Sequence, residues 1–253
     1  FQRAPCRPAD GARFPLLAFA FAAKRYLSHY VRARTGGAVY CGAMENAENN
    51  YDNEDAIPLE STVQTLGPDE RGMMTELFYA FNTVVTLQAF GDESVCRAAF
   101  AEARAACRTF ERRYSRTLPH SDIARLNAAG GAPVAIAPDT AELLRAAQGF
   151  CADSEGCFDI TVGPLVRLWD FHEGVVPTQA RIDEALAHVD WRALRVWEEP
   201  ADASEATTPQ AFAQLSDPQA AVDVGGIAKG WIADKLTDLL AARGLDAFIV
   251  NLG

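Results

Sequence analysis

A glycine turn followed by a lysine is the part of this sequence whose residue types are best suited to chemistry. Residues 221–230 read AVDVGGIAKG, in which Asp223 ends an apolar segment and a helix is expected to begin just after Gly226. Glycines let a backbone approach a ligand closely, and the free amide groups at a helix start favour an anion. Lys229 adds a full positive charge beside them. The segment therefore predicts a cradle for a pyrophosphate group; without a ligand it would be a tight turn with a surface lysine.

Neither of the two common nucleotide-binding patterns describes this turn. The dinucleotide fingerprint needs G-x-G-x-x-G, and the P-loop needs Ser or Thr directly after its lysine, whereas Lys229 is followed by Gly230. Asp223, at the end of an expected strand, could accept hydrogen bonds from a ribityl, ribose or ring nitrogen group. It could equally cap the turn, and the residues alone leave both interpretations open.

A second segment, residues 156–169, has polar and glycine positions that interrupt an apolar run, GCFDITVGPLVRLW. Backbone groups around Cys157 and Phe158 could receive a flat aromatic ligand, with Asp159 holding its polar edge. The alternative is a core segment followed by a proline-initiated helix that carries Trp169 inward. Cys157 has no neighbouring His or basic residue, so nothing indicates a nucleophilic thiolate.

A third segment, residues 115–127, is a proline-bearing loop that ends in a helical turn, which Ser121 is placed to cap. Taken alone it is most simply a connector. His120 in this loop and His172 further on could each act as a general base. Neither has a recognisable partner in the sequence, so both are expected to be solvent-exposed loop histidines, and no catalytic residue is assigned.

The segments must be held in place by strands and helices. Residues 80–90, AFNTVVTLQAF, are rich in β-branched and aromatic residues and predict the first strand. Ser94 is expected to cap a helix over 94–113 that has small and apolar residues along one face. The other expected helices cover 121–127, 138–152, 178–188 and 227–243, and the other expected strands cover 194–197, 212–215, 220–224 and 247–252.

Two of these strands, 212–215 and 220–224, are separated by the turn residues Asp217 and Pro218, which predicts a hairpin. The last strand, 247–252, is expected to be buried because it is apolar and follows a helix that Gly244 ends. The order of elements favours an α+β fold with mixed sheets and helices packed on them.

Composition limits the classes of protein that fit. The chain has 253 residues, 49% of them hydrophobic, which is enough for a globular domain with a real core. Its formal net charge of -11 argues against a sequence-independent nucleic-acid binder, so no nucleic-acid partner is expected. Six cysteines show neither a C-x-x-C pair nor zinc-type spacing with the four histidines, which favours ordinary reduced thiols.

The two ends of the chain differ from the middle. Residues 1–72 show no sustained period and predict a poorly ordered extension, which leaves 73–253 as the functional domain. The apolar run 14–23 is half the length of a spanning helix, so no integral membrane segment is expected. Because this run and its flanks make no clear export signal, a cytoplasmic location is favoured, with export as the alternative.

Four segments together resemble the ApbE family of FAD:protein FMN transferases, in the same order. Residues 81–86, FNTVVT, are similar to the family's M-G-T-x-x-T, and residues 115–127 to its S-x-Y-x-x-x-S-E-I-S-x-L-N. Residues 156–169 are similar to G-x-F-D-I-T-V-G-P-L-V-x-L-W, and residues 223–230 to D-L-G-G-I-A-K-G. The resemblance covers about residue 78 to residue 253, roughly two thirds of a family domain, and implies a T-fold-like α+β domain cut before its C-terminal third.

The resemblance also implies a site. Gly226 would give Mg²⁺ a backbone oxygen, and further metal ligands of the family, an Asp and a Thr, would lie beyond Gly253. The sequence departs from the family at Phe81-Asn82, where the family has Met-Gly, and at Thr117, where it has Tyr, so ring packing is expected to differ. The positions that would line the FAD site are Phe81, Thr117, Cys157, Phe158, Asp159, Asp223 and Lys229.

The reaction implied by the resemblance is attack by a threonine hydroxyl of an acceptor protein on the FMN phosphorus of FAD, with release of AMP. Mg²⁺ would neutralise the pyrophosphate. Two alternatives stay open at this stage: an Mg²⁺-dependent FAD pyrophosphatase, in which water replaces the threonine, and a non-catalytic flavin-binding protein.

Overall fold

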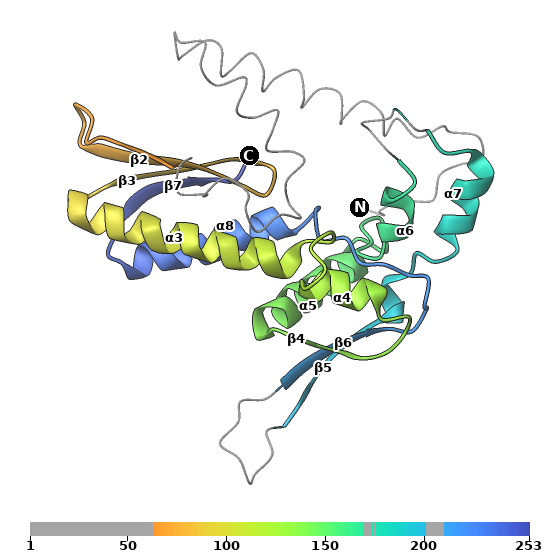
Figure 1. Ribbon diagram of the computed structural model, residues 1–253. Coiled ribbons are helices and arrows are strands. Elements are labelled where there is room, and N and C mark those ends of the chain that lie inside the picture. The colour runs from red at the N-terminus through yellow and green to blue at the C-terminus, as the bar shows by residue number, and fades with distance from the viewer. Residues whose placement is uncertain (1–62, 170–173, 175, 201–209) are drawn as a thin grey trace, which may run out of the picture. The chain divides into compact units, whose positions relative to one another are not determined.

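Two antiparallel sheets with helices packed on them make up the described part of the chain, residues 63–169, 174, 176–200 and 210–253 of the computed structural model (Figure 1). The first sheet has the strand order β1-β2-β3-β7 and the second β4-β6-β5. The α+β class is thus confirmed. Parallel pairing within these residues is limited to an isolated bridge between Val162 and Ala221. Residues 1–62, which make up most of the predicted extension 1–72 and include the apolar run 14–23, lie outside the described residues.

The first sheet contains a hairpin where a single strand is predicted. The first expected strand, 80–90, begins with a turn: Phe81 and Asn82 have φ values of 54° and 57° and join two strands. Two left-handed residues suit the twist of a two-residue hairpin, but Phe is unusual there, which is why the sequence did not reveal it. The strands are β1 (Gln64–Leu66), β2 (Met73–Ala80), β3 (Thr83–Phe90) and β7 (Ala247–Asn251).

Two strand predictions for this sheet need correction. β1 lies inside the segment 1–72, which is predicted to be a poorly ordered extension. Gln64–Leu66 pairs with β2, so the sheet begins before residue 73. β7 is only partly buried among the described residues, with Ile249 56% exposed, rather than a buried strand. It pairs with β3 on one side and carries alternating exposed positions.

Helices α3 (Glu93–Tyr114) and α8 (Ala228–Ala242) cover one face of the first sheet, as Figure 1 shows. The helix cap of α3 is Asp92 rather than the expected Ser94, because the Asp92 carboxylate accepts the amide protons of Ser94 and Val95. Asp and Ser are equally good caps, and here the earlier residue takes the role. The buried residues of α3 recur at helical spacing: Cys96, Ala99, Phe100, Ala103, Cys107, Phe110 and Tyr114.

The second sheet differs from the prediction at its hairpin. β6 (Gln210–Leu215) lies between β4 (Val134–Ile136) and β5 (Leu194–Glu199), and residues 220–224 do not pair with it. The expected hairpin is therefore wrong: 220–224 finds its hydrogen-bond partners in other elements. The helices near this sheet and in its connections are α4 (Asp122–Ala128), α5 (Pro138–Asp153), α6 (Gly163–Val166), α7 (Gln179–Leu186) and the 3-10 helix η2 (Trp191–Ala193).

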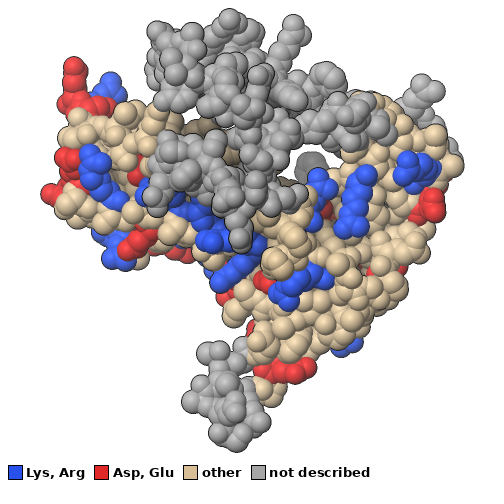
Figure 2. All heavy atoms as spheres, viewed as in Figure 1, with Lys and Arg blue, Asp and Glu red and all other residues tan. Residues whose placement is uncertain are grey.

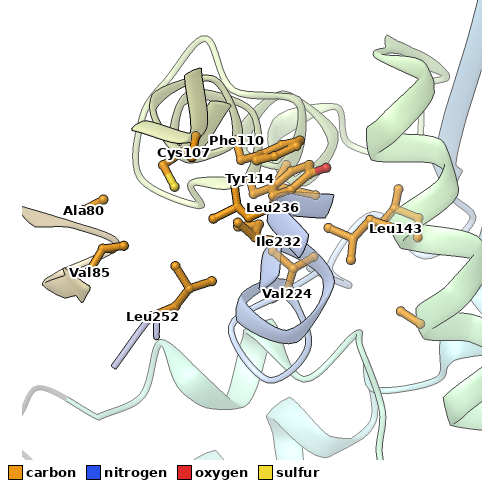
Figure 3. Close-up of a cluster of buried hydrophobic side chains, with 14 of the residues drawn as sticks. Ala80, Val85, Cys107, Phe110, Tyr114, Leu143, Val224, Ile232, Leu236 and Leu252 are labelled. Carbon is orange, nitrogen blue, oxygen red and sulfur yellow. The ribbon is translucent and has the colours of Figure 1, made fainter. Parts of the chain in front are cut away.

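One hydrophobic core joins α3 and α8 to the residues that precede α8. The rings of Phe110 and Tyr114 stack with centroids 5.5 Å apart, and Figure 3 shows them beside Leu236. Val224, the residue after Asp223, points into the same cluster. Burial raises the pKa of the Cys107 thiol to about 12, so this cysteine is an inert part of the core.

The described helices include none that is both long and apolar enough to cross a membrane.

Truncating the core on α8 is expected to destabilise the protein. Leu236 is fully buried, so Leu236→Ala should lower the free energy of unfolding by about 2–5 kcal/mol, through lost transfer energy and the cavity left behind. Leu186 is 48% exposed, and Leu186→Ala should change it by no more than about 0.5 kcal/mol. Denaturant unfolding of both variants checks this; equal losses would contradict the assignment of the core.

Candidate functional site

The segment 223–230 forms a tight turn that leads directly into α8. The amide of Gly225 donates to Oδ1 of Asp223 at 2.8 Å, so Asp223 does cap the turn. The Val224 carbonyl accepts the amides of Ile227 and Ala228 at 3.0 and 2.8 Å. The turn is thus set by its own backbone and one carboxylate. We call this segment the phosphate turn, after the ligand that its sequence predicts.

The start of α8 leaves donors and a cation available to a ligand. No side chain caps this helix. Among the described residues, the amides of Lys229 and Gly230 have no acceptor, and Lys229 makes no side-chain hydrogen bond or ion pair. Lys229 is partly buried and lies in the first turn of α8. Unpaired amides at a helix start, together with an ammonium group, suit an anionic group such as a phosphate.

Phe158 lies against the phosphate turn from the second predicted segment. Its amide donates to Oγ of Ser154 at 3.0 Å, and its ring packs against the core. A Cβ atom added at Gly226 would stand 3.2 Å from Cε2 of Phe158, so the absence of a side chain at Gly226 allows this close approach. The structure therefore brings together two of the predicted site residues that are far apart in the sequence.

The carboxylate of Asp159 is occupied by its own protein. Oδ1 accepts the amide and the hydroxyl of Thr161 at 2.7 and 2.6 Å, and Oδ2 accepts the amide of Trp191 at 3.0 Å. These bonds shape the loop that carries Phe158 and tie it to η2. A contact between Asp159 and the polar edge of a flavin stays a prediction, while its role in holding the loop is visible directly.

The loop 158–163, which we call the Phe158 loop, is hydrogen-bonded to residues 221 and 223, where the phosphate turn begins. The amide of Asp223 donates to the Ile160 carbonyl at 2.9 Å, and the amide of Gly163 donates to the Ala221 carbonyl at 3.0 Å. A Cβ atom added at Gly163 would stand 2.5 Å from that Ala221 carbonyl oxygen, which is closer than real contacts allow. Gly163 is thus a glycine because the two backbones touch there.

Arg116 is a charged residue at the site that sequence reasoning missed. Its Nε lies 3.5 Å from Oδ2 of Asp223, and its side chain is 47% exposed while that of Asp223 is 15% exposed. The pair joins the third segment to the phosphate turn. A basic residue beside the predicted Thr117 was the available signal, but nothing in the sequence showed that it would face Asp223.

The remaining predicted residues are Phe81, Thr117 and Cys157, of which the last two are sequence neighbours of Arg116 and Phe158 at this centre. Phe81 sits in the β2–β3 turn, partly buried, with its amide donating to Oε1 of Glu111 at 2.8 Å. Thr117 is exposed, and its hydroxyl lies 3.1 Å from that of Ser115. Cys157 is exposed next to Phe158. In the described part of the chain no hydrogen bond connects Phe81 or Thr117 to the phosphate turn, so their flavin contacts stay predictions.

A metal ligand set is not complete within the described residues. They contain no group of three or more His, Cys, Asp and Glu side chains that could hold a metal ion. The predicted ligand, the Gly226 carbonyl oxygen, accepts no hydrogen bond from any described residue, so it fits a hard cation. Of the two histidines considered as bases, His120 is exposed and His172 lies outside the described residues.

A side chain at Gly163 is expected to disturb the contact between the two loops. Because the nearest atoms are backbone atoms of Ala221, Gly163→Ala should lower the free energy of unfolding by about 1–3 kcal/mol. Gly149 in α5 has no atom within 4 Å of its added Cβ, so Gly149→Ala should be neutral or stabilise the helix by up to about 1 kcal/mol. Denaturant unfolding of the two variants tests this, and a neutral Gly163→Ala would refute the close contact.

Comparison with solved structures agrees with this fold. The flavin transferase ApbE from Vibrio cholerae superposes with a TM-score of 0.60 at 22% identity, over 72% of this chain and 57% of that chain. The apo form of the Pseudomonas stutzeri flavinyl transferase ApbE gives a TM-score of 0.58, also at 22% identity, over 76% and 56%. At this identity the likeness shows the fold alone.

Comparison with known sequences shows the family. An FAD:protein FMN transferase from Treponema pallidum is 36% identical over 136 residues, which are 53% of this chain and 36% of that protein. One from Rhodobacter capsulatus is 29% identical over 183 residues, 71% of this chain and 34% of that protein, so the matches span about a third of these relatives. The family model described as ApbE family matches residues 81–253, well over half of the chain, and the chain therefore belongs to the ApbE family.

Proposed function

We propose that the protein transfers the FMN part of FAD to a threonine hydroxyl of an acceptor protein, in an Mg²⁺-dependent reaction that releases AMP. The observation that carries the proposal is the phosphate turn, where Lys229 and two free amides stand at the start of α8 and Phe158 packs against Gly226. The relatives from T. pallidum and R. capsulatus are named FAD:protein FMN transferases, which supports the same activity.

The chain's own residues bind the pyrophosphate of FAD and its flavin ring. The pyrophosphate lies at the start of α8, where it receives hydrogen bonds from the amides of Lys229 and Gly230 and the charge of the Lys229 ammonium group. The ring system lies toward the loop of Phe158, with Phe81, Thr117 and Cys157 as its further lining. Oδ1 of Asp223 keeps its hydrogen bond from the Gly225 amide, and Oδ2, which Arg116 approaches at 3.5 Å, also accepts hydrogen bonds from the sugar-like chain.

The reaction then has one bond-forming and one bond-breaking event. The threonine oxygen of the acceptor attacks the phosphorus of the FMN phosphate, its hydroxyl proton passes to solvent, and the bond from that phosphorus to the bridging oxygen breaks. AMP leaves with the electron pair of that bond as added negative charge. Lys229 and the helix amides stabilise that charge as it develops, which lowers the barrier.

Mg²⁺ would be held in part by the Gly226 carbonyl oxygen, which no described residue uses. Its chemistry is to neutralise the pyrophosphate and the leaving phosphate. The remaining ligands are not among the side-chain groups of the described residues. The acceptor protein is identified only by its chemistry, an accessible threonine. A cytoplasmic location stays a prediction from the sequence. Residues 1–62, which contain the apolar run weighed as an export signal, lie outside the described residues.

Removing the charge of Lys229 is expected to slow transfer with little effect on folding. In the full-length protein, Lys229→Gln should lower the rate of flavin transfer at least tenfold, which corresponds to about 1.4 kcal/mol of transition-state stabilisation. The measurement is covalent flavin fluorescence of a threonine-bearing acceptor after denaturation, with FAD and Mg²⁺ supplied.

The substitution Lys235→Gln is the matched control, because it removes the same charge from the same helix. The Lys235 ammonium lies 2.9 Å from Glu142 and over the Trp231 ring, so Lys235→Gln should leave transfer within about twofold. EDTA should abolish transfer by the wild type. Conversion of FAD to FMN and AMP without labelling would instead favour the pyrophosphatase, and FAD binding without turnover would favour a non-catalytic flavin-binding protein.

A further inference from the structure

The side chain of Asn127 is hydrogen-bonded to the backbone of the residue that precedes Asp223. Nδ2 of Asn127 donates to the Val222 carbonyl at 2.8 Å, and the Val222 amide donates to Oδ1 of Asn127 at 2.7 Å. One amide side chain thus supplies both hydrogen bonds that a neighbouring strand would supply to this residue. Val222 is 1% exposed, so without Asn127 its two polar groups would be buried and unpaired.

The other side of the same segment is also paired. Residues 221 and 223 bond to the Phe158 loop through the Gly163 amide and the Ile160 carbonyl. The segment 221–223 therefore runs like a central strand that has a backbone neighbour on one side and the Asn127 side chain on the other. This explains why 220–224 has the apolar character of a strand but does not pair with β6.

Asn127 is itself held on a well-anchored helix. Oγ of Ser121 accepts the amide of Ala124 at 2.9 Å and so caps α4. Asp122, which is 7% exposed, accepts the hydroxyl of Thr140 at 2.6 Å and the amide of Ala137 at 2.9 Å. These bonds fix α4 against the start of α5. A fixed helix lets the Asn127 amide determine where Val222 lies, rather than follow it.

We propose that Asn127 is a positioning residue for the phosphate turn. By clamping Val222 it fixes the next residue, Asp223, and through the bond from Gly225 to Asp223 it fixes the glycines that approach the ligand. Its effect on FAD rests on the proposed function, whereas its effect on the turn does not. Asn127 need not touch FAD or the reacting atoms; it acts through the Val222 backbone.

The substitution Asn127→Asp separates this role from general packing. It keeps the size of the side chain and the acceptor for the Val222 amide, but it replaces the donor by a second carboxylate oxygen that faces the Val222 carbonyl at hydrogen-bond distance. Gln148 offers the same change elsewhere, because its Nε2 donates to the Leu194 carbonyl at 2.8 Å, at the start of β5. Gln148→Glu is therefore the matched control.

The experiment measures local hydrogen exchange and FAD affinity in the full-length protein. In Asn127→Asp, amide exchange of the segment 221–226 should become at least about tenfold faster, and the Kd for FAD should rise at least about tenfold, a factor that equals about 1.4 kcal/mol. In Gln148→Glu both should stay within twofold, even where the two variants lose similar thermal stability.

Each outcome decides a separate claim. Unchanged exchange in 221–226 would overturn the clamp, and faster exchange with unchanged FAD affinity would reduce Asn127 to a structural residue. If the wild type binds no FAD, the proposed function fails and the exchange data alone judge the clamp. If Asn127→Asp does not fold, the wild type still tests it: the Val222 amide should exchange as slowly as core amides, and exchange at the rate of an open turn would refute the proposal.

Discussion

The backbone hydrogen bonds of residues 221–223 are the constraint on which the candidate site depends. Ala221 and Val222 are buried, so their polar backbone groups need partners within the protein. The partners come from two other parts of the chain, the loop 158–163 and the side chain of Asn127. Satisfying a single buried segment therefore brings three stretches of sequence together, and the phosphate turn begins where that segment ends.

The same arrangement explains how an acidic protein can present a site for an anion. The formal net charge is -11, and in Figure 2 the described face carries basic and acidic side chains interspersed. Under the proposed function, the attraction of a pyrophosphate is therefore local. Lys229 and the start of α8 would supply it, while Arg116 offsets the charge of Asp223 beside them. A charge beside a bound group acts on it more strongly than a charge elsewhere on the surface, because the interaction falls with distance and is screened by salt.

Several elements of the fold followed from local pattern. The helix α8 and the strand β7 were predicted within one or two residues, because their apolar spacing and the glycine between them are unambiguous. The turn at Phe81-Asn82 was not, since its left-handed backbone is rare for Phe and has no sequence signature. The expected hairpin of 212–215 with 220–224 failed for another reason: a strand-like pattern shows that a segment is buried, and says nothing about which neighbour pairs with it.

The sequence by itself determined the family, the α+β class and the glycine turn with its lysine, because these depend on residue types at short spacings. Tertiary structure alone decided which distant residues meet that turn. The approach of Phe158 to Gly226, the contact of Gly163 with Ala221 and the pairing of Arg116 with Asp223 all join parts of the chain far apart in sequence. So does the bond from Asn127 to Val222. Which distant residues meet depends on how the whole chain packs and on which groups satisfy its buried polar atoms, and a linear pattern does not encode either.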